Sequence, residues 1–199
     1  PLLKGQSPLS SGVLNARMYD AMRDRGHITG YHIDALAAVD IALWDLKGKL
    51  LGQPVWQLLG GAYRDTIPCY VSGLPEPDLP ARCQLAKRWQ AKGFNAVKLA
   101  LGYGVREDVA NVRAVRETLG EEAQIFLDAH WNYSVADAAE LATALREFGV
   151  GFLEAPLLPE DVEGHRELRS KSPVAIALGE TERTRYQFKS FIEKRAADI

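Results

Sequence analysis

The sequence contains no long hydrophobic run, few cysteines and no marked excess of charge, and each absence excludes a class of protein. No apolar stretch approaches the roughly 18–20 residues that a membrane span needs, so we expect no membrane partner. The formal net charge of −2 over 199 residues gives no electrostatic reason to expect nucleic acid as a partner. The two cysteines, Cys69 and Cys83, lack metal-binding spacing, and we expect buried thiols in a reducing cytoplasm.

Targeting segments and nucleotide-binding motifs are absent as well. The first residues, Pro1–Gln6, lack an initiator methionine and the layout of a signal peptide. No apolar run is followed by Gly-x-Gly-x-x-Gly, so there is no dinucleotide fingerprint. The remaining composition, 47% hydrophobic and 25% charged, is typical of a globular protein with a good core.

The first third of the chain reads as helices without strands. Residues 1 to about 34 are mixed and turn-rich, with Ser-Ser-Gly at 10–12. From Ala35 the apolar residues follow a helical period until Gly48, and a short helix over Val55–Leu59 ends at a Gly-Gly pair. We therefore predict a helical domain over residues 1–64.

From residue 65 onward, apolar runs of strand length alternate with helical stripes. This alternation is typical of βαβ units with a buried parallel sheet. The predicted strands are Ile67–Ser72, Ala96–Ala100, Ile125–Asp128, Gly151–Glu154 and Ala175–Leu178, with the start of a sixth at Ala197–Ile199. We predict an α/β fold over residues 65–199, the first portion of an incomplete (β/α)8 barrel, because a complete barrel needs about 250 residues. An open doubly wound sheet is the alternative, although its switch point would gather ligands from two strands and not from three consecutive ones.

Three carboxylates follow three of these runs at equal spacing. Asp128 precedes Glu154 by 26 residues, and Glu154 precedes Glu180 by 26 again. If the strands are neighbours, these side chains meet at one rim and repel one another by a few kcal/mol per pair at about 4–6 Å. Such a cluster needs protonation or a shared hard cation, and we interpret it as a Mg²⁺ site. The other reading of each acid is a helix cap or a partner for a nearby arginine.

Two further residues are candidates for chemistry at the same rim. Lys98 lies in an apolar strand, and strand alternation places it on the same face as Ala100. We expect its ammonium to lie beside the acids; the other reading is a structural lysine in a salt bridge. His130 follows Asp128 by two and could protonate a leaving group or bind substrate. We expect the other histidines, His165 among them, to be surface or packing residues, and Trp131 and Tyr133 to line either the pocket or the core.

Several segments together resemble the mandelate racemase/muconate-lactonizing branch of the enolase superfamily. The resemblance runs from about residue 30 to the C-terminus and is carried by Ala37–Lys49, Leu58–Gly61, Val97-Lys98, Asp128-Ala129-His130, Glu154-Ala155-Pro156 and Gly179-Glu180-Thr181. It implies a capping domain before a modified barrel, with Asp128, Glu154 and Glu180 as the three Mg²⁺ ligands. It also implies that the metal binds a substrate carboxylate while a base removes the neighbouring proton, giving an enediolate.

One departure from the family pattern favours dehydration. Ala100 stands where many members carry a second lysine that serves as the base. Members without it commonly use a His-Asp pair from later strands, and a histidine placed like His130 resembles the general acid of galactonate- and mannonate-type dehydratases. The resemblance therefore implies a hydro-lyase acting on a sugar acid, with Lys98 and His130 as catalytic residues.

Other readings stay open at this point. The enzyme could be a racemase or cycloisomerase of the same branch. Because the strands that should carry the base are not in the sequence, the 199 residues could belong to a longer polypeptide or form a catalytically inactive fragment. For the enzyme as a whole we expect a homo-oligomer in the cytoplasm.

Overall fold

The computed structural model describes residues 2–199 and divides into two compact units. The first unit ends at Ile67, and the second runs from Pro68 to Ile199. No helix in the described part of the chain combines the length and the apolar character needed to cross a membrane.

The first unit is helical. Its elements are the 3-10 turns Pro8–Ser10 and Arg23–Arg25 and the helices α1 (Ser11–Asp20), α2 (Tyr31–Leu51) and α3 (Val55–Leu58). Helix α1 lies within the predicted helical domain, in the stretch that we described as mixed and turn-rich. The Ser-Ser-Gly signal is outweighed because Leu14 and Met18, one helical turn apart, are both buried.

The second unit alternates strands and helices without exception. Its elements are β1 (Val71–Ser72), α4 (Leu79–Ala91), β2 (Ala96–Ala100), α5 (Val105–Leu119), β3 (Gln124–Asp128), α6 (Val135–Arg146), β4 (Val150–Glu154), α7 (Val162–Lys171), β5 (Ala175–Ala177) and α8 (Arg185–Lys194). The strands form one parallel sheet in chain order, which confirms the α/β prediction. A doubly wound sheet would reverse its strand order, so that alternative is wrong.

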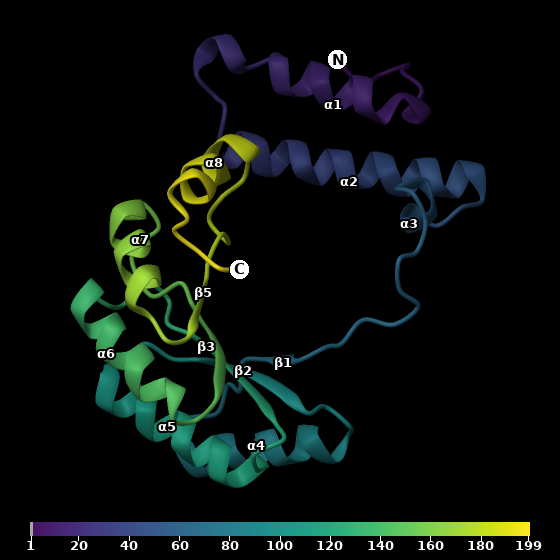
Figure 1. Cartoon of the computed structure of the whole chain (residues 1–199). Coiled ribbons are helices and arrows are strands. Elements are labelled where there is room, and N and C mark those ends of the chain that lie inside the picture. The colour runs from purple at the N-terminus through teal and green to yellow at the C-terminus, as the bar shows by residue number, and fades with distance from the viewer. Residues whose placement is uncertain (1) are drawn as a thin grey trace. The chain divides into compact units, whose positions relative to one another are not determined.

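The two faces of the sheet carry different kinds of side chain. Figure 1 shows helices α4 to α7 along one side of the sheet. The side chains that point to these helices are aliphatic and essentially inaccessible to solvent: Val97, Leu99, Ile125, Leu127, Leu153 and Ile176. The opposite face carries Lys98 and two stacked rings, Phe126 and Phe152, whose centroids lie 4.3 Å apart. Strand alternation therefore separates the core from a face that is open to chemistry.

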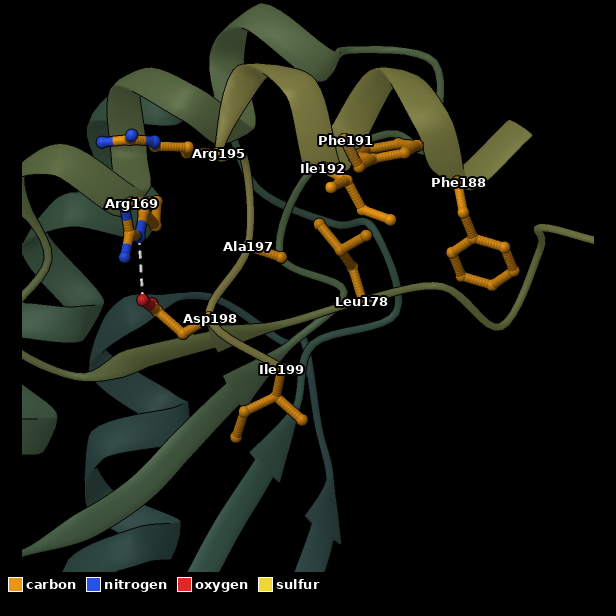
Figure 2. Close-up of a pocket in the computed structure, with 9 residues that line it drawn as sticks. All are labelled: Arg169, Leu178, Phe188, Phe191, Ile192, Arg195, Ala197, Asp198 and Ile199. Carbon is orange, nitrogen blue, oxygen red and sulfur yellow. Dashed lines mark hydrogen bonds and ion pairs between the residues drawn. The ribbon is translucent and has the colours of Figure 1, made fainter. Parts of the chain in front are cut away.

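The sheet is open at both ends in the described residues, because β1 and β5 do not pair with each other. Beyond β5, the backbone of Asp198 donates to Ile176 O at 2.8 Å, so Ala197–Ile199 follows the path expected for a sixth strand. The Asp198 carboxylate accepts from Ile176 N at 3.0 Å and from Arg169 Nε at 2.8 Å, and Figure 2 shows the latter contact.

Two smaller expectations are wrong. Strand β1 covers only Val71 and Ser72, whereas we predicted Ile67–Ser72, since pairing with β2 begins only at Val71 and Pro68 lacks an N–H to donate. Cys69 is exposed and Cys83 is half-buried, and neither takes part in a disulfide. An exposed thiol results because this segment lies ahead of the paired part of the strand.

Candidate functional site

Two of the predicted carboxylates lie side by side at the rim where the strands end. Asp128 is the last residue of β3 and Glu154 the last of β4, and their Cα atoms are register partners. The Asp128 side chain is only 9% exposed and that of Glu154 19%. Hydrogen bonding between the strands fixes both backbones, so the two acids project from adjacent positions of neighbouring strands.

Lys98 supplies the positive charge between these acids. Its Nζ lies 2.5 Å from Glu154 Oε2 and 3.4 Å from Asp128 Oδ2. Burial lowers the pKa of Lys98, but the hydrogen bond to Glu154 and the charges of both acids outweigh it and raise the pKa above its ordinary value. The ammonium therefore stays charged at neutral pH. This placement agrees with the sequence prediction that Lys98 lies beside the acids.

His130 is held by the same aspartate. Its Nδ1 lies 3.1 Å from Asp128 Oδ1, and its backbone N–H donates to that oxygen at 3.2 Å. The imidazole is 48% exposed, so the ring borders solvent beside two nearly buried carboxylates. A ring oriented at Nδ1 can still present Nε2 to a bound molecule. The role of His130 stays a prediction.

Glu180 is placed differently from the other two acids. Strand β5 ends at Ala177, which pairs with Glu154, so Glu180 lies three residues beyond the equivalent position, in an exposed turn after Gly179. Within residues 2–199, no three His, Cys, Asp or Glu side chains form a group that could hold a metal ion. Equal spacing of 26 residues suggested that Glu180 ends its strand as Glu154 does, but Ala177 occupies that position. Its role as a ligand stays a prediction.

The rim segments that follow β3 and β4 have a strained backbone. His130, Trp131 and Ala155 adopt positive φ angles of 49°, 60° and 45°, which side chains with a Cβ rarely adopt. Trp131 N donates to Ala155 O at 2.7 Å, so the strained segments bond to each other. Each such residue costs about 1–2 kcal/mol, and strain of this kind persists where neighbours hold it, often at functional sites.

A buried carboxylate that we did not single out from the sequence organises the neighbouring loop after β2. Asp108, which is inaccessible to solvent, accepts hydrogen bonds from Gly102 N at 2.9 Å, Tyr103 N at 3.1 Å and Tyr133 Oη at 2.5 Å. Gly102 is required here, because a Cβ would lie 2.5 Å from Ala129 O. In the sequence, Asp108 resembles an ordinary acid in the first turn of a helix.

This network shows which of the two predicted positions, pocket wall or core, Tyr133 occupies. Tyr133 is 9% exposed and belongs to the core. Burial, followed by the hydrogen bond to Asp108, raises the pKa of the Tyr133 phenol well above its ordinary value. The loops after β2 and β3 are therefore tied together next to the carboxylate rim.

A cavity near the C-terminus belongs to another part of the fold. Figure 2 shows it between α8 and the Ala197–Ile199 segment, with Leu178, Phe188 and Ile192 lining it. Its volume is about 350 Å³, and none of Lys98, Asp128, Glu154 or His130 contributes to its wall. We therefore assign the chemistry to the strand-end rim and not to this cavity.

The donor set at the rim suits a hard cation. Asp128 and Glu154 offer carboxylate oxygens, the ligands that Mg²⁺ prefers. The ammonium of Lys98 already lies between them, which shows that this space accepts positive charge. Two carboxylates, a lysine and a histidine can together bind a carboxylate substrate through a metal and move a proton.

Comparison with known families decides the wider assignment. Residues 81–199 match the family described as "Enolase C-terminal domain-like", and residues 12–60 match "Mandelate racemase / muconate lactonizing enzyme, N-terminal domain". The chain belongs to the enolase superfamily. The resemblance seen in the sequence is thereby confirmed.

Relatives of this enolase-superfamily chain catalyse more than one reaction. D-galactarolactone cycloisomerase of Agrobacterium fabrum is 36% identical over 202 residues, which cover 99% of this chain and 53% of the relative. D-xylonate dehydratase of Haloferax volcanii is 30% identical, covering 100% of this chain and 53% of the relative. The chain thus spans about half the length of these relatives.

Solved structures give the same family and fold. The 3,6-anhydro-D-galactonate cycloisomerase of Zobellia galactanivorans superposes with a TM-score of 0.95 at 33% identity, covering 100% of this chain and 56% of that one. A mandelate racemase/muconate lactonizing protein of Paracoccus denitrificans, complexed with magnesium, has a TM-score of 0.88 at 37% identity, covering 98% and 54%. The chain covers just over half of each of these structures, and its open five-stranded sheet agrees with an incomplete barrel.

The Asp108–Tyr133 contact predicts a specific pH dependence. Because folding raises the Tyr133 pKa, its contribution to stability is complete below the ordinary value of 10.0 and is lost as the pH rises toward the folded value. In urea titrations, the difference in unfolding free energy between wild type and Tyr133→Phe should shrink above pH 10, by up to about 1.4 kcal/mol per pH unit. Tyr63→Phe, at a ring that is 98% exposed, is the matched control. A constant difference for Tyr133→Phe would contradict the assignment.

Proposed function

We propose that the protein containing this chain is a Mg²⁺-dependent dehydratase of a sugar acid. It removes the proton next to the substrate carboxylate and then releases water. The observation that carries the proposal is the Asp128–Lys98–Glu154 cluster, with His130 bonded to Asp128, at the strand-end rim. Sugar-acid dehydratases acting on D-xylonate and L-rhamnonate are among the relatives.

Asp128 and Glu154 would hold the metal, and Glu180 is the predicted third ligand. When bound, Mg²⁺ would supply a fixed positive charge that stabilises negative charge developing on the substrate carboxylate, an effect of several kcal/mol in a dry site. Two solved relatives are described with magnesium, which supports this choice of ion. The carboxylates are already held for it by the β3–β4 register.

Lys98 would assist the same charge development. Its ammonium lies against both carboxylates and would add positive charge beside the reacting carboxylate. Ala100, two residues further on the same face, has no group that accepts a proton. We therefore propose a base on a later strand, as the family resemblance implies.

His130 would give a proton to the departing hydroxyl. Asp128 orients the ring through Nδ1, and the half-exposed imidazole lies beside the metal-binding rim, where a substrate bound through its carboxylate would extend. Protonation turns hydroxide, a poor leaving group, into water.

Cycloisomerisation is the second candidate. It is favoured because D-galactarolactone cycloisomerase and 3,6-anhydro-alpha-L-galactonate cycloisomerase are 36% and 39% identical to this chain. A cycloisomerase rearranges its substrate without change of mass, whereas dehydration removes one water. Mass spectrometry of the products from a panel of aldonic acids, aldaric acids and their lactones separates the two activities.

Neutralising one carboxylate should weaken Mg²⁺ binding. In Glu154→Gln an amide replaces the anionic ligand, and we expect at least a roughly tenfold loss of affinity, measured by isothermal titration calorimetry. Glu117→Gln, which changes the same charge on an exposed part of α5, should bind Mg²⁺ like the wild type. Equal affinities for wild type and Glu154→Gln would remove Glu154 from the ligand set.

His130 can be tested separately from the base. With the protein that contains this sequence, His130→Asn should lower dehydration by about 10²–10⁴-fold, while deuterium from D₂O still enters the carbon next to the carboxylate. His27→Asn, at an exposed histidine of the first unit, serves as the control. Loss of both exchange and dehydration would give His130 a role in proton abstraction; full retention of dehydration would exclude it as the acid.

A further inference from the structure

A small cavity lies at the turn that carries Glu180. Residues of the turn, of the rim segments after β3 and β4, and of helices α7 and α8 line it. It is lined by Trp131, Ala155, Leu157, Pro159, His165, Leu178, Gly179, Glu180, Thr181, Glu182 and Phe191. The space open to the centre of a water molecule is about 10 Å³, which is at the lower limit for holding one water.

His165, on α7, brings an unsatisfied polar atom to this cavity. The residue is 1% exposed, and its Nδ1 lies 2.8 Å from Asp161 O. A carbonyl oxygen can only accept, so Nδ1 carries the proton and Nε2 of the neutral ring is an acceptor. Burial lowers the His165 pKa, which agrees with a neutral ring. Among residues 2–199, no atom pairs with Nε2.

The carboxylate and hydroxyl side chains around the cavity do not supply the missing donor, and the indole N–H of Trp131, which also lines the cavity, does not pair with Nε2. Glu180 and Glu182, when ionised, are acceptors only. The Thr181 hydroxyl donates to Glu182 Oε1 at 3.0 Å, so its proton is already used. An acceptor on α7 and acceptors on the turn therefore line the same cavity, and a molecule with two donors can join them.

We propose that this cavity binds one structural water. The water donates one proton to His165 Nε2 and the other to an acceptor of the Glu180–Glu182 turn. It thereby ties the turn to α7. A polar cavity of this size with acceptors on both sides suits a bound water, since an unpaired buried acceptor is unfavourable.

The water makes His165 a positioning residue for the turn. This part of the inference rests on the proposed function, because Glu180 is the predicted third Mg²⁺ ligand. His165 touches neither metal nor substrate in this account. Its effect passes through the water to the turn, and from the turn to the carboxylate.

The unmodified chain provides the first test. In ¹⁵N NMR of histidine-labelled protein, His165 should show a protonated Nδ1 and an unprotonated Nε2 that accepts a hydrogen bond. A crystal structure should show one ordered water about 2.7–3.2 Å from Nε2. A protonated Nε2, a protein donor placed directly on it, or a dry cavity would each overturn the proposal.

A variant tests the positioning role. His165→Phe keeps a ring of similar breadth but removes the acceptor, and it should speed amide hydrogen exchange at Glu180–Glu182 by about tenfold or more and weaken Mg²⁺ binding several-fold. His27→Phe should change neither quantity. Unchanged exchange in a folded His165→Phe protein would refute the positioning role. If wild type binds no Mg²⁺ but the NMR and exchange results hold, the proposed function fails while the water site stands.

Discussion

Two poorly solvated carboxylates at the ends of neighbouring strands are the central constraint on this molecule. The parallel register of β3 and β4 places Asp128 opposite Glu154 at the end of both strands, and neither side chain is well solvated. At a separation of about 4–6 Å, the repulsion amounts to a few kcal/mol at an effective dielectric constant near 20. The fold tolerates this pair because Lys98 lies between them, and the same demand for positive charge makes the rim a candidate metal site.

The rest of the second unit holds this arrangement in place. Aliphatic side chains on one face of each strand anchor the sheet to its helices, which leaves the other face to Lys98 and the acids. Above the strands, the strained segments at His130 and Ala155 are joined by a backbone hydrogen bond, and the buried Asp108 fixes the adjoining loop. Rigidity at the rim therefore comes from interactions that lie outside the reacting groups themselves.

Much of the fold could be predicted because buried parallel strands have a strong signal. The bounds of β2 are as predicted, and β3 and β4 each begin one residue earlier than predicted. Helix α1 was missed because its apolar period is weak, and β1 was overextended because an apolar run does not reveal where pairing begins. The division into residues 1–64 and 65–199, the homo-oligomer and the cytoplasmic location stay predictions.

The site was less predictable than the fold. The placement of Asp128, Glu154 and Lys98 at one rim could be predicted, because strand alternation and the ends of apolar runs are visible in the sequence; their roles stay predictions. Equal spacing failed to place Glu180, since the strand before it ends three residues earlier. The role of Asp108 depends on a hydrogen bond to Tyr133, 25 residues away, which no local pattern reports.

The stability of Lys98→Met, with and without Mg²⁺, tests the central claim most directly. Without metal, removing the ammonium should lower the free energy of unfolding by roughly 2–3 kcal/mol, because two partly buried carboxylates lose their counter-charge. Added Mg²⁺ should stabilise this variant more than the wild type, whereas Lys87→Met, at an exposed lysine of α4, should behave like the wild type in both conditions. A Lys98→Met protein that is as stable as the wild type and indifferent to Mg²⁺ would contradict the account.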